Sequence, residues 1–478
     1  MKSYQAELSL RIAEERAAVE LIKITSDLSF TKSIELTIFR HQLIDKRSSE
    51  ILYLHEYATN FVHKPINIFE TLSIAKEIKL SKLPPSKIDV GKLTFEWINE
   101  KNNNNINSFI SDKLNFVREE SINIQPKDVV LFGFGRIGRL LARELMAQEG
   151  KGEQLRLRAI VVRKNDHQNI IKRASLLRTD SIHGKFPGTV VEDPKNKALI
   201  INGQSVQLIK ASYPDEIDYT LYGIKDALVI DNTGIYRDKE SLTRHLKSKG
   251  TSKVLLTAPG KGIPNIVFGA NHMEYKLDSH DVFSAASCTT NAITPILKIV
   301  NDKLGIDKGH IETVHAYTND QNLVDNMHKN ERRGRAAALN MVITNTGAGN
   351  AVVKVIPDLA GKLTANAVRV PIPNGSLAIL NLSINSKTNI VKFNNIIRNA
   401  ALNGPLVEQI NYSISHELVS TDIVGNNAAA IFDSPATIVS KDGKNIVLYV
   451  WYDNEYGYSR QVMRLAKYIS NVRRPRNY

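Results

Sequence analysis

The spacing of apolar residues changes along the chain. Up to about residue 124, apolar residues recur at helical intervals between charged ones, as in AELSLRIAEERAAVELIKI. In the run SIELTIFRHQLIDKRSSEILYLHEYA, residues Leu36, Phe39 and Leu43 fall at the same spacing and predict more helix. The run KNNNNIN at 101–107 predicts a polar loop. We therefore predict a helical N-terminal extension over residues 1–124.

The pattern of apolar and polar residues changes at Lys127, where short apolar runs rich in β-branched residues begin to alternate with helical patterns. DVVLFGFGRIGRLLARELMAQ and LRLRAIVV are examples, and such alternation predicts βαβ units on a parallel sheet. We expect a doubly wound α/β domain of the Rossmann type over residues 125–287. The longer runs that follow predict an α+β domain over 288–455, with its helices on one face of the sheet. A last helix, within 456–478, is expected to return to the first of these domains.

Cysteine and histidine usage excludes several classes of protein. The 478 residues contain one cysteine, Cys288, so an internal disulfide framework and a thiolate-rich metal site are excluded. The twelve histidines form no cluster with metal-ligand spacing, and we predict no metal. The charged N-terminus does not resemble a secretory signal, and no apolar run approaches the roughly 18 residues of a membrane span. We expect a cytoplasmic protein that does not bind membranes.

The formal net charge of +14 is unevenly distributed. Residues 1–124 hold 17 basic and 17 acidic side chains, so the remainder carries the whole excess. This excess is typical either of a solubilising surface or of a positive site for phosphorylated ligands. Basic residues do not interleave with aromatic ones, which makes nucleic acid an unlikely partner.

A glycine pattern follows the first predicted strand of the α/β domain. Gly133, Gly135 and Gly138 form GxGxxG between an apolar strand and a helix. In that setting the first glycine allows a tight turn, the second lets backbone approach a pyrophosphate, and the third permits close helix–strand packing. The helix N-terminus would add amides and a partial positive charge, so we predict a dinucleotide site.

The lone cysteine lies in SAASCTTNAITP, where a helix is expected to begin just after Cys288. Ser287, Thr289 and Thr290 are suitable capping residues. A thiol at a helix N-terminus has its thiolate favoured by the helix dipole and free amides. The alternative is an inert cysteine in the core, which the flanking hydroxyls disfavour without excluding.

Six motifs carry a resemblance to a known family. GFGRIGR, ASCTTN, TVHAYTNDQ, RAAALNMVITNTGA, AVRVPIPNGS and WYDNEYGYS occur in the order typical of glyceraldehyde-3-phosphate dehydrogenases. The resemblance spans roughly residues 127–470, and His315 follows Cys288 by 27 residues, as in that family.

The resemblance implies a phosphorylating oxidation of glyceraldehyde 3-phosphate. Cys288 would attack the aldehyde, His315 would act as the base, and inorganic phosphate would release the resulting thioester as 1,3-bisphosphoglycerate. Hydroxyls, amides and arginine suit the two phosphate groups involved. The residues that match the substrate-phosphate positions are Thr318, Asp320 and Arg369. Those that match the inorganic-phosphate positions are Ser287, Thr289, Arg333, Thr346 and Gly347.

The same resemblance implies NAD or NADP as cofactor and a homotetramer. The residues that match cofactor contacts are Gly133, Gly135, Arg136, Ile137, Gly138, Thr233, Gly234, Thr257, Asn454 and Tyr458. The second strand of the α/β domain departs from the family pattern. Where the family has an acid for the adenine ribose, this chain has Arg163 and Lys164, with Asp166 shortly after. Basic residues would suit the 2′-phosphate of NADP, so Arg163 joins the candidate cofactor residues and the choice stays open.

Two other departures complete the sequence-based account. Ala292 stands where many family members have a second cysteine, which should lessen oxidative trapping of Cys288. Residues 1–124 have no counterpart in the typical enzyme and could cover an interface, bind a partner or be passive. Two alternative functions remain: an erythrose-4-phosphate dehydrogenase, and a regulatory binding protein built on this scaffold.

Overall fold

The structure is a computed structural model that describes residues 3–100, 105–119, 124–148, 150–344 and 346–477. It divides into two compact units. The large unit comprises residues 127–148 and 155–471, and the small unit comprises residues 1–126, 149–154 and 472–478. Most of the predicted polar loop at 101–107 lies outside the described residues. Within the described part of the chain, no helix combines the length and apolar character needed to cross a bilayer.

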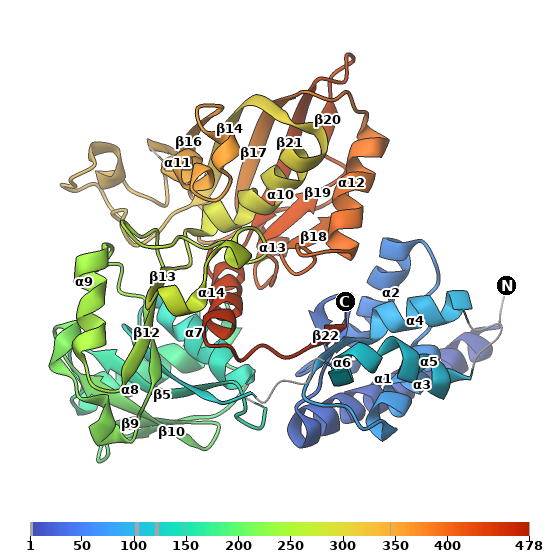
Figure 1. The fold of residues 1–478 in the computed structure, drawn as a ribbon, viewed down its shortest axis with the longest axis horizontal. Helices are drawn as coiled ribbons and strands as arrows, with labels where there is room; N and C mark the ends of the chain where they lie inside the picture. The colour runs from blue at the N-terminus through green and yellow to red at the C-terminus, as the bar shows by residue number, and fades with distance from the viewer. Residues whose placement is uncertain (1–2, 101–104, 120–123, 149, 345, 478) are drawn as a thin grey trace. The chain divides into compact units, whose positions relative to one another are not determined.

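The small unit is mainly helical, as predicted, and also contains a four-stranded sheet in the order β2-β1-β3-β22 (Figure 1). Helix α1 packs against α2 and α3, and α3 packs against α4. The helices are α1 (Tyr4–Lys32), α2 (Ser48–Val62), α3 (Ile68–Leu80), α4 (Val90–Glu100), α5 (Ile106–Lys113) and α6 (Asn115–Glu119). The strands are β1 (Glu35–Ile38), β2 (His41–Gln42), β3 (Lys87–Asp89) and β22 (Arg476–Asn477).

The predicted helix through Leu36, Phe39 and Leu43 is wrong, because a tight hairpin occupies that stretch. Phe39 and Arg40 have positive φ angles of 42° and 73°. The buried carboxylate of Asp89 accepts hydrogen bonds from both of their backbone N–H groups, at 2.9 Å each. An acceptor 50 residues away in the sequence therefore overrides the helical spacing.

The C-terminal tail adds the edge strand of this sheet. Strand β22 runs parallel to β3, with Arg476 opposite Lys87. The Lys87 backbone N–H donates to the Pro475 carbonyl at 2.9 Å. Gln154, from the short segment between the large unit's first two strands, donates to the Val472 carbonyl. The small unit is thus assembled from three separate parts of the chain.

The first half of the large unit is the expected doubly wound domain, with strand order β13-β12-β11-β4-β5-β10-β9-β8. The strands from β13 to β10 are parallel, and β8 and β9 add an antiparallel edge. From β4 the chain continues to β5 on one side of β4, and it later returns to β11 on the other side. The direction of strand order therefore reverses between β4 and β11. In such sheets a ligand binds at the carboxyl ends of the strands where this reversal occurs. The strands are β4 (Lys127–Phe132), β5 (Leu155–Val162), β8 (Val190–Asp193), β9 (Ala198–Ile201), β10 (Gln204–Lys210), β11 (Ala227–Asp231), β12 (Thr251–Leu256) and β13 (Val282–Ser284). The associated elements are α7 (Arg136–Ala147), α8 (His167–Arg178), β6 (Thr179–Asp180), β7 (Gly184–Lys185) and α9 (Lys239–Thr243).

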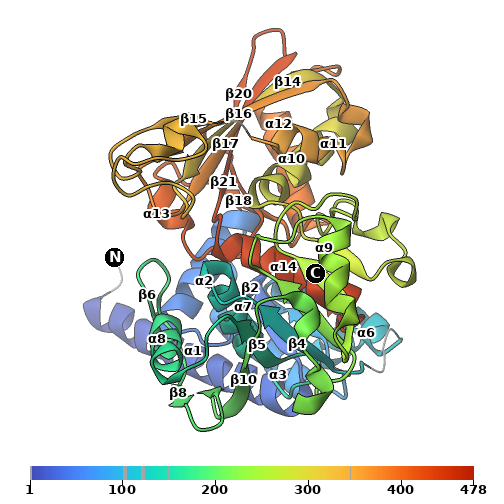
Figure 2. The same cartoon turned by 90° about the vertical axis from the view of Figure 1, so that its left-hand side faces the viewer.

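The second half of the large unit is a mixed sheet in the order β15-β16-β14-β17-β21-β19-β18, with β20 paired to β21. Helices α10, α11 and α12 lie together beside this sheet in Figure 2. The strands are β14 (Ile306–Ala316), β15 (Val342–Thr344), β16 (Leu363–Val370), β17 (Ser376–Ile384), β18 (Ile410–Ser413), β19 (Ala430–Asp433), β20 (Ile438–Val439) and β21 (Asn445–Tyr452). The helices are α10 (Cys288–Leu304), α11 (Ala348–Val353), α12 (Ile390–Leu402), α13 (Ser420–Ile423) and α14 (Tyr456–Ile469).

The last helix, α14, packs against α7 of the doubly wound domain. A buried ion pair between Arg460 on α14 and Glu144 on α7 crosses this contact. Helix α7 begins at the candidate cofactor residue Arg136, and α14 contains another, Tyr458, in its first turn. The segment after each helix belongs to the small unit.

Deleting residues 472–478 should loosen β3 in the small unit. The Lys87 amide would lose its acceptor, and one backbone hydrogen bond is worth about 1 kcal/mol. Amide hydrogen exchange at Lys87–Asp89 should therefore become about fivefold faster or more, while exchange in β16 of the large unit, the internal control, should not change. Unchanged protection at Lys87–Asp89 would show that the tail does not support this sheet.

Candidate active site

The lone cysteine lies at a sharp turn between β13 and α10. Ala286 adopts a positive φ of 54°, and the Tyr458 hydroxyl holds it by donating to its carbonyl at 2.9 Å. Ser287 caps the helix, because its hydroxyl accepts from the Thr290 backbone N–H at 3.0 Å. Cys288 is the first residue of α10 and is half-buried. The helix and its cap were predicted, whereas the Ala286 turn was not.

His315, near the end of β14, faces this thiol. Its Nε2 lies 3.6 Å from the Cys288 Sγ, and the imidazole is buried. The other ring nitrogen, Nδ1, lies 2.7 Å from the Ala316 carbonyl oxygen and 2.8 Å from Nη1 of Arg369. When Nδ1 donates to Ala316, Nε2 carries the lone pair that can accept the thiol proton. When Arg369 donates to Nδ1, Nε2 carries a proton and can donate to a thiolate.

Burial keeps both groups neutral near pH 7. It raises the pKa of the Cys288 thiol above the usual value, although the Arg369 charge and the Thr289 hydroxyl lower it in part. Burial and then the Arg369 charge lower the pKa of His315 to about 3. The expected stabilisation of the thiolate by the helix N-terminus is therefore outweighed by desolvation. A thiol and a neutral imidazole form a nucleophile–base pair in which the proton is still to be moved.

Two residues that the sequence analysis did not single out hold this pair in place or link it to Asn454. The Tyr452 hydroxyl lies 3.0 Å from the Thr289 hydroxyl, and its ring packs edge-on against His315. The Ser376 hydroxyl accepts from the Ala316 backbone N–H at 3.1 Å and donates to the Asn454 side chain at 2.8 Å. Tyr452 is the second residue of the motif WYDNEYGYS and Ser376 is the last residue of AVRVPIPNGS, so their place in these motifs was the only signal in the sequence.

The substrate-phosphate candidates gather beside His315. Arg369 lies within 3.4 Å of the Thr318 hydroxyl, and Thr318 in turn donates to Asp320. Arg333, which the resemblance assigns to inorganic phosphate, pairs with Asp320 and donates to Thr344 at 2.9 Å. Burial alone would raise the pKa of Asp320, but the Thr318 hydrogen bond and the two arginines lower it overall. The structure thus joins Arg333 to the substrate-phosphate group through one carboxylate.

Thr346 and Gly347 lie apart from these contacts, at the start of α11. The Thr346 hydroxyl accepts from the Ala348 backbone N–H at 3.2 Å. Gly347 caps the helix, and a Cβ there would meet nothing within 4 Å. Helix α11 packs against β16 and against α10, the helix that begins at Cys288.

The predicted dinucleotide loop has the geometry of a phosphate cradle. Gly133 has a φ of +104° that L side chains rarely adopt. A Cβ on Gly138 would lie 2.8 Å from the Gly133 carbonyl oxygen, so helix and loop approach too closely for a side chain. A Cβ on Gly135 would meet nothing within 4 Å, which leaves its backbone open to a ligand. Ile137 follows as the second residue of α7 and is half-buried.

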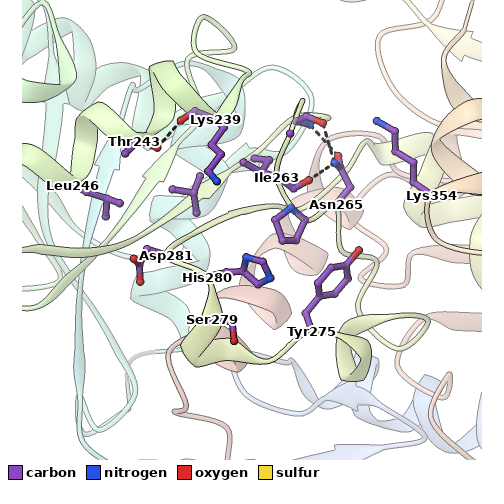
Figure 3. A pocket seen from close by; sticks show the side chains of 14 residues that line it. Lys239, Thr243, Leu246, Ile263, Asn265, Tyr275, Ser279, His280, Asp281 and Lys354 are labelled. Atoms are coloured by element: carbon purple, nitrogen blue, oxygen red, sulfur yellow. Dashed lines mark hydrogen bonds between the residues drawn. The ribbon is translucent and has the colours of Figure 1, made fainter.

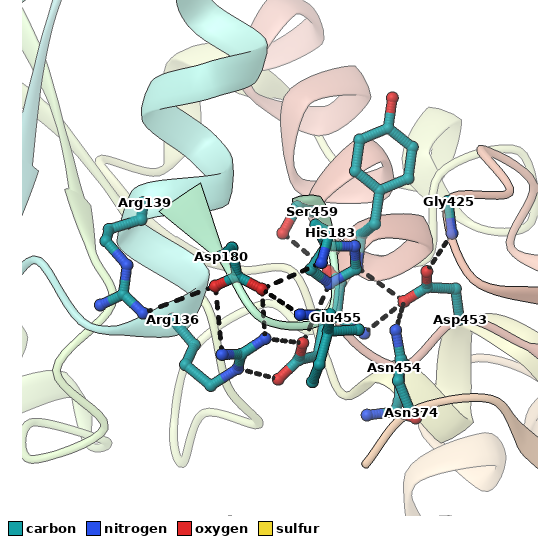
Figure 4. Close-up of polar contacts among 12 residues, drawn as sticks. Arg136, Arg139, Asp180, His183, Asn374, Gly425, Asp453, Asn454, Glu455 and Ser459 are labelled. Carbon is teal, nitrogen blue, oxygen red and sulfur yellow. Dashed lines mark hydrogen bonds and ion pairs between the residues drawn. The ribbon is translucent and has the colours of Figure 1, made fainter. Parts of the chain in front are cut away.

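The side chain of Arg136 is held by two carboxylates (Figure 4). It donates to Glu455 at 2.5 Å and to Asp180 at 3.2 Å, and His183 lies 3.0 Å from the same Glu455. Burial would raise the pKa of Asp180, but the His183 and Ile182 backbone N–H groups and Arg136 bring it to about 2. The guanidinium is therefore occupied, and the amide of Arg136 at the start of α7 is the group left for a phosphate.

The remaining cofactor candidates follow β11 and β12. Thr233 donates through both its backbone N–H and its hydroxyl to Asp231, and Gly234 has a φ of +68°. Thr257 donates to the Asp231 backbone carbonyl at 2.9 Å. Strand β11 is the neighbour of β4 and β12 is the next strand along, and both loops leave the carboxyl ends of these strands, where a doubly wound sheet binds its ligand.

The segment after β5 bears on the choice of cofactor. Arg163 and Lys164 follow the strand directly and are exposed. Asp166 caps α8, and its carboxylate accepts from the Asn169 backbone N–H at 3.0 Å and from the Asn169 side chain at 2.7 Å. Its oxygens are thus engaged in the helix cap.

Comparisons with known proteins agree with this geometry. The family models for the glyceraldehyde 3-phosphate dehydrogenase NAD-binding domain and C-terminal domain match residues 127–239 and 287–454. The chain belongs to the glyceraldehyde-3-phosphate dehydrogenase family. It is therefore an oxidoreductase with an NAD(P)-binding domain.

Similar members of the glyceraldehyde-3-phosphate dehydrogenase family differ in how much of this chain they match. A glyceraldehyde-3-phosphate dehydrogenase-like protein of Pseudomonas aeruginosa is 47% identical over 95% of this chain and 99% of its own length. Glyceraldehyde-3-phosphate dehydrogenase 2 of Nostoc is 39% identical over 72% of this chain and 98% of its own length. Glyceraldehyde-3-phosphate dehydrogenase 1 of Bacillus subtilis is 39% identical over 71% of this chain and 96% of its own length. Of these three relatives, the one that matches nearly the whole chain is the protein named glyceraldehyde-3-phosphate dehydrogenase-like. The two named as dehydrogenases without that suffix match about 70% of it.

The electrostatics of the site predict the pH profile of thiol alkylation. Because burial raises the pKa of Cys288 and Arg369 opposes it, the rate with iodoacetamide should rise with pH to a midpoint above that of an exposed cysteine. Arg369→Gln should move this midpoint to higher pH. Arg335→Gln, at an exposed arginine paired with Asp325, is the matched control and should leave it unchanged. A midpoint that Arg369→Gln does not move would contradict this account.

Proposed function

We propose that this protein is a phosphorylating glyceraldehyde-3-phosphate dehydrogenase that converts glyceraldehyde 3-phosphate to 1,3-bisphosphoglycerate. The observation that carries the proposal is the 3.6 Å contact between Cys288 Sγ and His315 Nε2, beside Arg369 and Thr318. A nucleophile and a base lie within reach of each other and of cationic and hydroxyl groups that suit a phosphate.

In the proposed reaction, the Cys288 sulfur attacks the aldehyde carbon while its proton passes to Nε2 of His315. His315 returns this proton to the former carbonyl oxygen, which becomes the hydroxyl of a thiohemiacetal. The imidazole, neutral again, removes that hydroxyl proton as the hydride leaves the same carbon, and a thioester to Cys288 remains. NAD(P)⁺, when bound, accepts the hydride that leaves the same carbon. The phosphate oxygen attacks the thioester carbonyl, the acyl phosphate departs, and the Cys288 sulfur is released. Buried surroundings favour transfer of the thiol proton to a group 3.6 Å away over its loss to solvent.

The two phosphate sites are proposed to differ in their donors. Arg369 and Thr318 would bind the substrate's own phosphate beside His315, and Asp320 would position Arg333 and Thr318 rather than touch a phosphate. The turn at Thr346 and Gly347, together with Ser287 and Thr289, would receive inorganic phosphate. The contact between Arg333 and Asp320 implies that Arg333 reaches the second site only if it exchanges partners.

The proposed assembly is a homotetramer. An exposed apolar surface on the segment between β14 and β16 supports it. The apolar residues of this surface are Leu323, Val324, Met327, Leu339 and Met341. Such a surface is typical of a protein interface, and sedimentation of a tetramer would give four times the 53.4 kDa chain mass.

The single free thiol supports a cytoplasmic location, which cell fractionation would test.

Replacing the nucleophile and the base tests the chemistry. Cys288→Ser should abolish NAD(P)H formation, followed at 340 nm, while dinucleotide binding stays nearly intact. His315→Asn should slow turnover by about 10²–10⁴-fold, the range for loss of a general base. Assays with glyceraldehyde 3-phosphate and erythrose 4-phosphate, each with and without phosphate, separate the two substrates. Turnover in Cys288→Ser would rule out the thioester route.

The division of the phosphate sites predicts separable kinetic defects. Arg369→Ala should mainly raise the KM for the phosphorylated aldehyde, because it removes a cationic donor. Thr346→Ala should mainly raise the KM for inorganic phosphate. Steady-state kinetics with each substrate varied in turn measures both. Equal effects of the two variants on both constants would refute the division.

We further propose that the enzyme uses NADP at least as well as NAD. The occupied carboxylate of Asp166 and the exposed Arg163 at the end of β5 support this choice. A charge-assisted bond to the 2′-phosphate is worth roughly 1.5–3 kcal/mol, a factor of about ten or more. Arg163→Ala should therefore lower kcat/KM for NADP about tenfold and leave NAD nearly unaffected. A strong NAD preference that is lost only in Asp166→Ala would contradict the proposal.

A further inference from the structure

A pocket of about 640 Å³ lies in the large unit, and none of its lining residues is a candidate for the active site or the cofactor site. Its walls come from α9 and the turn that follows it, from the loop between β12 and β13, and from Lys354 at the end of α11 (Figure 3). A volume of this size lies within the range of small-molecule sites, which runs from about 300 to 1,000 Å³.

The floor of the pocket is apolar. Leu246 and Ile263 are half-buried and pack against a core cluster that includes Leu242 and Val282. Tyr275 and His280 form the opposite wall, with their ring centroids 6.1 Å apart. These surfaces suit a flat or apolar body rather than a small inorganic ion.

Two lysines give the pocket a positive charge. Lys239 and Lys354 lie on opposite sides of it in Figure 3, and neither makes an ion pair within the described part of the chain. Asp281 is the one acidic residue that lines the pocket, and its charge acts to raise the pKa of Lys253, a residue that does not line the pocket. Positive charge beside an apolar floor favours an organic anion.

The polar groups at the back of the pocket have a structural role. The side chain of Asn265 accepts from the Gly260 backbone N–H and donates to the Gly260 and Ile263 carbonyls, at 2.9–3.0 Å. These bonds fix the loop from 258 to 265 and leave the two lysines as the charged groups for a ligand.

From these features we propose that the pocket binds a nucleotide-sized organic anion. The ring or apolar body packs between the Leu246–Ile263 floor and the Tyr275–His280 wall. The anionic groups contact Lys239 and Lys354.

The same loop connects the pocket to the cofactor candidates. It begins directly after Thr257, and the Lys261 backbone N–H within it donates to the Arg237 carbonyl at 2.8 Å. Arg237 in turn donates to the carbonyl of Gly234 at 2.8 Å. A ligand in the pocket therefore contacts a segment that is bonded to both cofactor loops, and it should alter NAD affinity. By linkage, NAD alters the ligand's affinity by the same factor.

Equilibrium binding of ATP to the full-length protein, with and without saturating NAD, tests the proposal. Wild type should bind ATP saturably, and inorganic tripolyphosphate, which lacks the ring, should bind more weakly. Lys239→Ala and Lys354→Ala should each weaken ATP binding about fivefold or more, since each removes one charged contact. Lys276→Ala, at an exposed lysine next to Tyr275 but outside the lining, is the matched control and should bind ATP as wild type does.

Three results would overturn the proposal. The first is the absence of saturable ATP binding to wild type. The second is unchanged ATP binding in both pocket variants. The third is an effect of ATP on NAD affinity that persists in full in both variants, because ATP would then occupy the cofactor site itself.

Discussion

The desolvation of Cys288 and His315 is the constraint on which the site depends. Burial raises the pKa of the thiol and lowers that of the imidazole to about 3, so the two groups face each other uncharged. Neither group forms an ion pair with the other, so the 3.6 Å contact is fixed by backbone geometry together with side chains that pack on or bond to the pair, among them Tyr452 and Arg369. The left-handed Ala286 turn positions the thiol, and the carbonyl and amide of Ala316 help to position the ring.

The arginines around this neutral pair show how the site balances its charge. Arg369 reaches His315 directly and lowers the pKa of Cys288 against the effect of burial. Arg333 and Arg136 instead each bind carboxylates, Asp320 for the former and Asp180 with Glu455 for the latter. In the proposed reaction, Arg369 is the one of the three that can meet an incoming phosphate without first leaving a carboxylate.

The sequence predicted those features that depend on interactions between residues close together in the chain. The glycines of the dinucleotide loop and the capped helix at Cys288 depend on neighbours within a few residues, and both were correctly predicted. The hairpin at Phe39 and Arg40 could not be, because it depends on Asp89, about 50 residues further on. The pairing of the C-terminal tail with β3 gave no signal, since two residues of strand carry no periodicity. Asp166 is an intermediate example: its sequence position suggested a ribose ligand, and only the structure shows its carboxylate bonded to Asn169 in the cap of α8.

The proposed reaction passes through a thioester on Cys288, which mass spectrometry of the trapped enzyme can detect. The protein is mixed with glyceraldehyde 3-phosphate and NAD(P) in phosphate-free buffer, digested at low pH, and the Cys288 peptide is weighed. The Cys288 peptide should be heavier by one 3-phosphoglyceroyl group, and this added mass should disappear when phosphate is added before the quench. An unmodified Cys288 peptide, or an adduct that phosphate does not discharge, would contradict the proposed reaction.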